Sequence, residues 1–246
     1  MIPFFRRIRK QFADDNKPIK YMRYAIGEIL LVVIGILIAL QVNNWNIEGK
    51  NSEKEEYYLK SIKTSIQLSQ KELNRVIEDA ELISSCADTL FKLIAQNNLS
   101  SLKGLFLDSL LFSSLDYSLI SLNDGGIQEI LNTGSLDLIK DERIRVFLAS
   151  WNDRMHQIRK FEGESQYLSR NFQEYLLQFV DAKRYLTYPE ESIVIPPKME
   201  ELLSDPMLTN YLEGITWEHR GMYHRYIEEK AVMDSLTVLI NEYLTK

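Results

Sequence analysis

Three histidines are the residues of this sequence whose type and spacing come closest to a metal site. His219 and His224 are five residues apart, so on a helix their directions differ by about 140° and they cannot share one ion. His224 and Glu228 have a usable helical spacing, but two ligands make a poor metal site. His156 lies in the polar run NDRMHQIRK and is expected on a polar helix face. We therefore predict no metal site.

Motifs for catalysis and cofactor binding are absent from the sequence. There is no P-loop, no dinucleotide-binding glycine pattern, and no HExxH, GxSxG or CxxC motif. The DGG run at 124–126 could hold an anion at a helix start, but a turn with a capping aspartate is the simpler interpretation. Trp217, Tyr223 and Tyr226 could line a pocket between helices, although core packing is the stronger expectation. We predict no catalytic residue, no cofactor and no enzymatic activity.

Glu28 is the acid whose position is energetically costly, because it lies near the start of the apolar run YAIGEILLVVIGILIALQVNNW, residues 24–45. On a helix, Gly35 and Ala39 fall within about 20° of Glu28. Small residues on one stripe let membrane helices approach closely, and a carboxyl group there can hydrogen-bond across the interface. Three interpretations stay open: a boundary residue that reaches the headgroups or a nearby base, a helix-association site, and a site of ion or proton coupling.

The apolar run is long enough to cross a bilayer. Residues 25–42 carry one charge, and a helix of that length covers about 27 Å. Tyr21 and Tyr24 on one side and Trp45 on the other are candidate interfacial anchors. A cleaved signal peptide would have a shorter apolar core and small residues at both cleavage subsites, which this run lacks. We expect an uncleaved signal-anchor, with a transmembrane helix at 24–45.

The charges on the two sides of the apolar run are opposite. Residues 1–23 have a net charge of +5, and the residues after Asn46 have a net charge of −10. The positive-inside rule then puts residues 1–23 in the cytoplasm and residues 46–246 outside it. The acidic balance of the larger part argues against nucleic acid as a partner. Cys86 is the only cysteine, so no intramolecular disulfide can form.

The cytoplasmic head, residues 1–23, is both basic and aromatic. Its run FFRRIRKQF favours an amphipathic helix that lies among anionic lipid headgroups, and a basic tail that only fixes topology is the alternative. The residues near one helical face are Phe4, Phe5, Ile8 and Phe12, and the candidate headgroup ligands are Arg6, Arg7, Arg9 and Lys10.

Two segments resemble a known family. MIPFFRRIRK followed by YAIGEILLVVIGILIALQVNNWN resembles the opening of a family of uncharacterised membrane proteins from Bacteroidota. The later segment TGSLDLIKDERIRVFLASW, residues 133–151, also resembles a segment of that family. The resemblance implies a single-pass protein of a bacterial inner membrane with a periplasmic domain. It implies no activity and no functional residue.

Heptad spacing predicts three long helices after the anchor, packed as a bundle or coiled coil. The first has the seam Leu59, Ile62, Ile66, Ser69, Leu73, Val76, Ala80, Ile83, Ala87, Leu90 and Ile94, and is expected to end at Asn97 and Asn98. A second begins near Asp141, with its rhythm interrupted around Gly163 and Ser165. A third follows Ser204 or Asp205 as N-cap, with Pro206 at its first position. Shorter helices are expected within 102–115 and 124–134, with Asp124 as cap and Gly134 as terminator, and a loop at 188–197.

The predicted fold class is therefore all-α: one N-terminal transmembrane helix followed by an extracytoplasmic bundle of about three long helices plus short helices. For function we expect a membrane-anchored, periplasmic, non-catalytic interaction or scaffold module. Its partners would be the lipid bilayer and either further copies of the chain or another membrane protein. Two alternatives stay open: a small subunit of an ion- or proton-coupled membrane complex that uses Glu28, and a periplasmic ligand sensor that acts through a partner.

Overall fold

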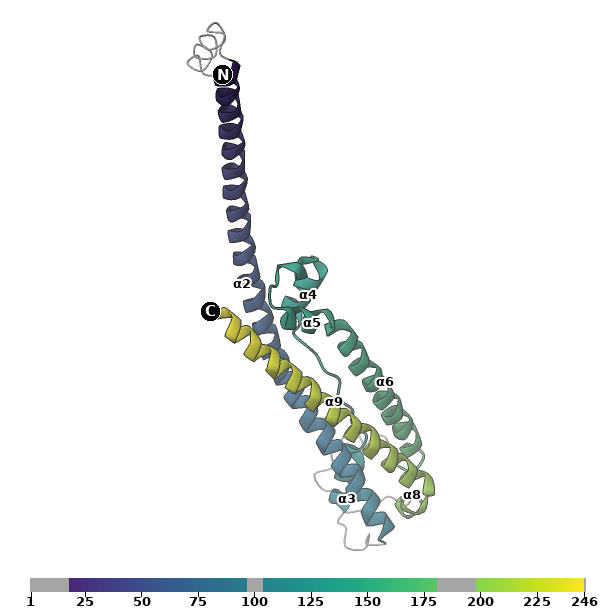
Figure 1. The fold of residues 1–246 in the computed structure, drawn as a ribbon. Helices are drawn as coiled ribbons and strands as arrows, with labels where there is room; N and C mark the ends of the chain where they lie inside the picture. The colour runs from purple at the N-terminus through teal and green to yellow at the C-terminus, as the bar shows by residue number, and fades with distance from the viewer. Residues whose placement is uncertain (1–17, 97–103, 181–197, 246) are drawn as a thin grey trace. The chain divides into compact units, whose positions relative to one another are not determined.

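The computed structural model describes residues 18–96, 104–180 and 198–245, and within these ranges it contains helices and no strand (Figure 1). The all-α prediction is therefore confirmed. In chain order the elements are α2 (Pro18–Ala95), α3 (Gly104–Ser113), α4 (Gly125–Asn132), the 3-10 helix η1 (Ser135–Leu138), α5 (Glu142–Ala149), α6 (Trp151–Leu176), α8 (Met199–Ser204) and α9 (Pro206–Leu244). The headgroup candidates Arg6, Arg7, Arg9 and Lys10, the helix end at Asn97 and Asn98, and the loop at 188–197 lie outside the described residues.

The chain forms two units, Met1–Glu55 and Glu56–Lys246. In the first unit α2 begins at Pro18, where a missing N–H costs nothing because the first helical amides have no intrahelical partner. Within the described residues, α2 is the one helix that is long and apolar enough to cross a membrane, with a segment of mean hydropathy 2.6. None of that segment is buried in the protein.

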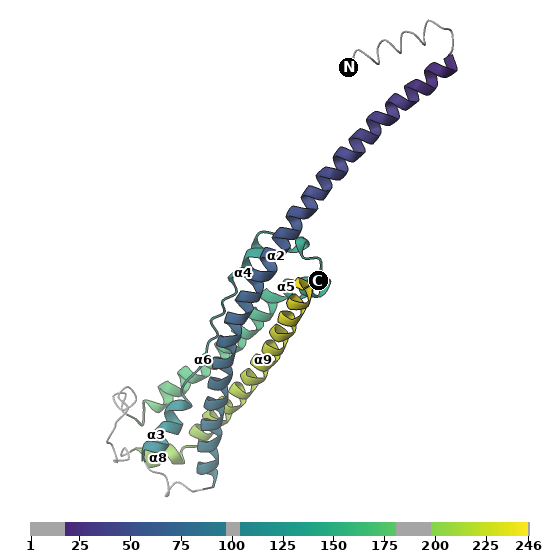
Figure 2. The same cartoon turned by 90° about the vertical axis from the view of Figure 1, so that its left-hand side faces the viewer.

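The second unit is built on three long helices, which are α6, α9 and the part of α2 that follows Glu56 (Figures 1 and 2). The heptad seam of α2 is confirmed, because each of its positions from Leu59 to Leu90 is buried and only Ile94 is half-buried. The facing positions of α9 are buried as well, among them Met222, Tyr226 and Met233. Burial of this apolar surface is the main term that stabilises long helices in water.

The second predicted helix begins where expected. The Asp141 carboxylate accepts hydrogen bonds from the N–H groups of Arg143 (2.9 Å) and Ile144 (3.3 Å), which caps α5. The hydrogen bond from the Arg143 guanidinium, together with these amides, lowers the pKa of Asp141 to about 2. The predicted second long helix is divided into two elements, because α5 ends at Ala149 and α6 begins at Trp151.

The backbone of α6 continues through Gly163 and Ser165, where the sequence shows an interrupted apolar rhythm. The apolar rhythm is lost there, but the buried face of the helix is not. Glu162, Ser165 and Ser169 occupy the seam between Ile158 and Phe172, and all three are buried. Polar side chains thus replace apolar ones on a face that still points into the bundle.

The start of α9 agrees with the sequence prediction. Asp205 is the N-cap, its carboxylate accepts a hydrogen bond from the N–H of Met207 (2.9 Å), and Pro206 is the first helical residue. The Tyr175 hydroxyl donates to the other carboxylate oxygen of Asp205 (2.8 Å). This contact joins the end of α6 to the start of α9.

The short helix α4 agrees in part with expectation. Gly134 has φ +67° and ends the turn after α4 in the left-handed region that glycine adopts without strain. Asp124 precedes α4, but its side chain does not cap the helix. Its carboxylate accepts hydrogen bonds from the Trp151 indole (2.9 Å) and the Gln128 amide (2.9 Å) instead.

Candidate functional site: polar contacts that hold the strap

An extended segment without helix or strand, residues 116–124, connects α3 to α4 along the bundle. We call it the strap. Its side chains alternate, with Tyr117 and Leu119 exposed and Ile120 buried. A segment of this kind has no helical hydrogen bonds of its own, so its buried backbone groups need partners from the surrounding helices.

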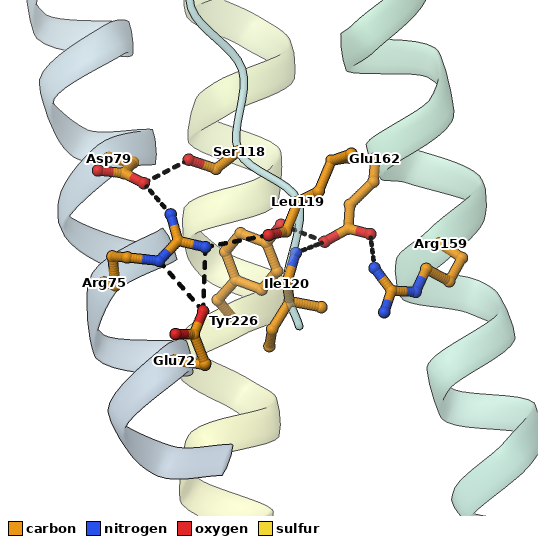
Figure 3. Close-up of polar contacts among 9 residues, drawn as sticks. All are labelled: Glu72, Arg75, Asp79, Ser118, Leu119, Ile120, Arg159, Glu162 and Tyr226. Carbon is orange, nitrogen blue, oxygen red and sulfur yellow. Dashed lines mark hydrogen bonds and ion pairs between the residues drawn. The ribbon is translucent and has the colours of Figure 1, made fainter. Parts of the chain in front are cut away.

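Glu162 supplies the central contact to the strap (Figure 3). One carboxylate oxygen accepts hydrogen bonds from the N–H of Ile120 (2.7 Å) and the hydroxyl of Tyr226 (2.9 Å). The other oxygen accepts from the Arg159 guanidinium (2.9 Å). The Glu162 side chain is only 1 % exposed, so these contacts replace water around a buried carboxylate and join the strap, α6 and α9. Burial raises the pKa of Tyr226, which keeps its hydroxyl a donor.

Arg75 holds the strap from α2 (Figure 3). Its guanidinium donates to the carbonyl oxygen of Leu119 (3.0 Å) and forms ion pairs with Glu72 (3.0 Å) and Asp79 (2.8 Å). Asp79 in turn accepts a hydrogen bond from the hydroxyl of Ser118 (2.6 Å). The Leu119 carbonyl and the Ile120 amide of one peptide unit are therefore bound by side chains of two different helices.

Serine hydroxyls extend these contacts along the strap. Ser69 of α2 accepts a hydrogen bond from the N–H of Asn123 (3.2 Å), and Ser169 of α6 donates to the carbonyl of Asp116 (3.2 Å). Just beyond the strap, Ser65 accepts from the N–H of Gly126 (3.0 Å). The strap is thus fixed near both ends by serine hydroxyls of α2 and α6, and at its centre by Arg75 and Glu162.

Ser165 and His219 form a second buried polar pair, between α6 and α9. The Nδ1 atom of His219 lies 3.0 Å from the carbonyl of Ile215, which can only accept, so Nδ1 carries the proton and Nε2 accepts from the Ser165 hydroxyl (3.1 Å). Burial lowers the pKa of His219, which favours the neutral imidazole. A serine that donates to histidine resembles half of a hydrolytic triad, but the two side chains are 3 % and 2 % exposed. The pair therefore acts as a structural link.

Arg154 and Glu229 form a third polar link between α6 and α9. Their side chains form an ion pair at 3.1 Å, and Glu229 is buried. Burial raises the pKa of Glu229, and the Arg154 charge opposes that shift. The guanidinium also lies over the ring of Phe147, 4.1 Å from the centroid.

The structure does not bring the candidate residues of the sequence into one site. Tyr226 packs in the core, Tyr223 is half-buried, and Trp217 is exposed. His156 and His224 are exposed, and no group of three or more potential metal ligands occurs in the ranges that the structure describes.

The membrane-helix candidates all lie in the first unit. Glu28 is half-buried and has a contact within the protein, whereas Gly35 and Ala39 are exposed and Gly35 has open space around it. Of the expected interfacial anchors, Tyr21 and Tyr24 belong to α2 and Trp45 is exposed.

A comparison with protein families gives a match over residues 28–172, which is more than half of the chain. The chain belongs to the family of unknown function DUF6090. No curated protein and no solved structure matches it. The DUF6090 match begins at Glu28, contains Arg75, the strap and Glu162, and ends before α9. The hydrogen bond from Tyr226 to Glu162 therefore joins a residue outside the matched region to one inside it.

Glu162 and Arg75, the two charged residues that hold the strap most directly, are not among the candidates predicted from the sequence. A signal for Glu162 was present, because Ile158, Glu162, Ser165, Ser169 and Phe172 continue the three–four spacing of a seam. Counting only apolar residues interrupts that pattern at Glu162. No comparable signal marks Arg75, because its partner in the strap is the backbone carbonyl of Leu119, which every residue type carries.

Proposed function

We propose that this protein is a membrane-anchored, non-catalytic interaction or scaffold module. The observation that supports this most is how the buried polar groups of the bundle are used. Glu162 binds the strap and α9, and both ring nitrogens of His219 are engaged by helix groups. A catalytic acid or base has to reach a bound substrate, and these groups are enclosed by the fold instead.

The proposed location is a bacterial inner membrane crossed once, with residues 1–23 in the cytoplasm and residues 46–246 in the periplasm. The apolar, unburied part of α2 supports a membrane-spanning helix. The net charge of +5 on residues 1–23 supports a cytoplasmic N-terminus.

Protease accessibility tests this orientation. Because the basic head resists translocation, protease added to the outer face of the inner membrane is expected to digest the chain beyond about Asn51 and to spare a tag at the N-terminus. Immunodetection of tags at the two ends measures both outcomes. A protected C-terminal tag would contradict the orientation.

The proposed partners are the lipid bilayer and either further copies of the chain or another membrane protein. Gentle detergent extraction, followed by mass measurement of the complex and identification of co-purifying proteins, tests this. A monomer that extracts without any partner would argue against an interaction module.

A second candidate function is a small subunit of an ion- or proton-coupled complex. The observation in its favour is that α2 is unbroken through residues 28–39, which keeps Gly35 and Ala39 within about 20° of Glu28. A carboxyl group beside small residues can hydrogen-bond to a neighbouring helix or carry a proton.

Two substitutions at Glu28 separate these roles. Glu28→Gln keeps a hydrogen-bonding group and removes the proton site, whereas Glu28→Leu removes both. For a role in helix association we expect Glu28→Gln to assemble like the wild type and Glu28→Leu to dissociate, because an interhelical hydrogen bond in a membrane is worth about 0.6 and up to ~1.7 kcal/mol. For proton coupling both variants should assemble and both should fail to complement a deletion strain. If neither substitution changes assembly or complementation, Glu28 is only a boundary residue.

A further inference from the structure

A groove between α2 and α9 is a surface feature of the second unit that the contacts described above do not explain. It has a volume of about 510 Å³, which includes space open to solvent. Its lining residues are Asp88, Phe91, Glu213, Thr216, Trp217 and Arg220. The Trp217 side chain is 78 % exposed, although its neighbours Ile215 and Thr216 are buried in the bundle.

An exposed indole of this kind is unfavourable in water, because it leaves a large apolar surface hydrated. Trp217 lies outside the seam of α9, so the core of the bundle gains nothing from it. Tryptophan and arginine beside a groove are the residue types that dominate binding energy at protein interfaces. Trp217 and Arg220 are three residues apart on α9 and both line this groove.

The charges at the groove complement one another. The Asp88 carboxylate pairs with Lys92 (2.7 Å) and with Arg220 (3.1 Å), and Glu213 lies one turn from Trp217. Asp88, Glu213 and Arg220 line the groove together with the rings of Phe91 and Trp217, and Lys92 pairs with Asp88 beside it, so acids and bases flank an apolar surface. When two such patches meet across a twofold axis, the acids of one copy can face the bases of the other.

We propose that the groove around Trp217 is a contact surface between two copies of this chain. This inference rests on the proposed interaction function and names its partner and surface. A second copy fits better than an unrelated protein because the patch is complementary to itself in charge. Anchoring of every copy in the same membrane also raises the effective concentration of each copy around the others, which favours pairing.

Charge reversal with two tagged copies of the full chain tests the proposal. In Arg220→Asp the groove becomes acidic, and in Asp88→Arg it becomes basic, so each variant alone should repel its own copies. When Arg220→Asp and Asp88→Arg are co-expressed with different tags, pairing should be restored, because opposite charges then meet across the interface. Arg170→Asp, which reverses an exposed charge on α6, is the matched control and should pair like the wild type.

Trp217→Ala provides the second measurement, with Tyr167→Ala, an exposed aromatic on α6, as its control. We expect Trp217→Ala to reduce co-purification of the two tags by about thirtyfold, the change that marks a hot-spot residue. An unchanged helical circular dichroism spectrum establishes that each variant is folded.

The outcomes separate this inference from the proposed function. If differently tagged wild-type chains co-purify and the groove variants co-purify equally well, the contact surface is not this groove and the proposed function stands. If the wild-type chain captures only a different protein through Trp217, the groove is a contact surface but its proposed partner, a second copy of the chain, is wrong. If the wild-type chain captures neither itself nor any protein, both proposals are wrong.

Discussion

Replacing Glu162 with alanine is expected to lower the free energy of unfolding by about 2–6 kcal/mol. The substitution leaves two buried donors, the N–H of Ile120 and the hydroxyl of Tyr226, without their acceptor. Each buried donor without a partner costs about 1–3 kcal/mol. Arg159 adds little to this loss because its side chain is half exposed and can be hydrated. Urea titration of the detergent-solubilised chain, followed by circular dichroism, measures the change.

Two variants serve as controls for that measurement. Tyr226→Phe removes one donor and leaves the carboxylate with its other partners, so we expect a loss of about 0.5–1.5 kcal/mol. Glu164→Ala removes an exposed carboxylate from the same helix and should stay within about 0.5 kcal/mol of the wild type. A value for Glu162→Ala as small as that of Glu164→Ala would contradict the role assigned to Glu162.

Hydrogen exchange provides a local test of the same contact. In Glu162→Ala the amide of Ile120 should exchange faster, because its acceptor is gone. The amide of Asn123, which Ser69 binds, should change less because that hydrogen bond is retained. Equal acceleration at both amides would mean that the strap opens as one unit.

The long helices could be predicted from the sequence because their apolar seams are local and periodic. Every position from Leu59 to Leu90 on the α2 seam is buried as the spacing indicates, and Asp141 and Asp205 cap the helices that they precede. In these cases the residues that decide the structure lie within one element. Capping and amphipathic burial depend on near neighbours in the chain.

The polar interior could not be predicted in the same way, because its partners come from different elements. Glu162 is stabilised by an amide of the strap and a hydroxyl of α9, and His219 by Ser165 of α6. No local pattern encodes which distant group will satisfy a buried carboxylate or imidazole. The seam spacing can mark such a residue as buried, but its hydrogen-bond partners are known only from the fold.

The break between α5 and α6 was missed for a related reason. The segment around Ser150 keeps helical spacing on both sides, and Leu148 and Trp151 are both buried. The Ser150 hydroxyl donates to the carbonyl of Phe147 (2.9 Å), and the Arg154 guanidinium also binds that carbonyl (3.2 Å). Side chains thus satisfy a carbonyl at the end of α5, a compensation that apolar periodicity does not reveal.

Gly126→Ala is expected to destabilise the bundle, whereas the same change at the adjacent Gly125 should not. A Cβ atom at Gly126 would lie 2.7 Å from the backbone carbon and oxygen of Ser61, so α4 packs directly against the α2 backbone. Gly125 has no atom within 4 Å of the corresponding position. Forcing extra volume into a packed contact costs about 1–3 kcal/mol, and a backbone neighbour cannot rotate away as a side chain can.

The two glycines make a matched pair because they are consecutive and both lie in the first turn of α4. Alanine gains up to about 1 kcal/mol over glycine from helix propensity, and the gain is smaller at a helix start. The net expectation is therefore a loss for Gly126→Ala and a neutral or slightly positive change for Gly125→Ala. Displacement of α4 would also lengthen the hydrogen bond from the Gly126 N–H to Ser65, adding to the loss. Urea titration of both variants measures the difference, and equal stabilities would show that α4 does not pack on α2 through Gly126.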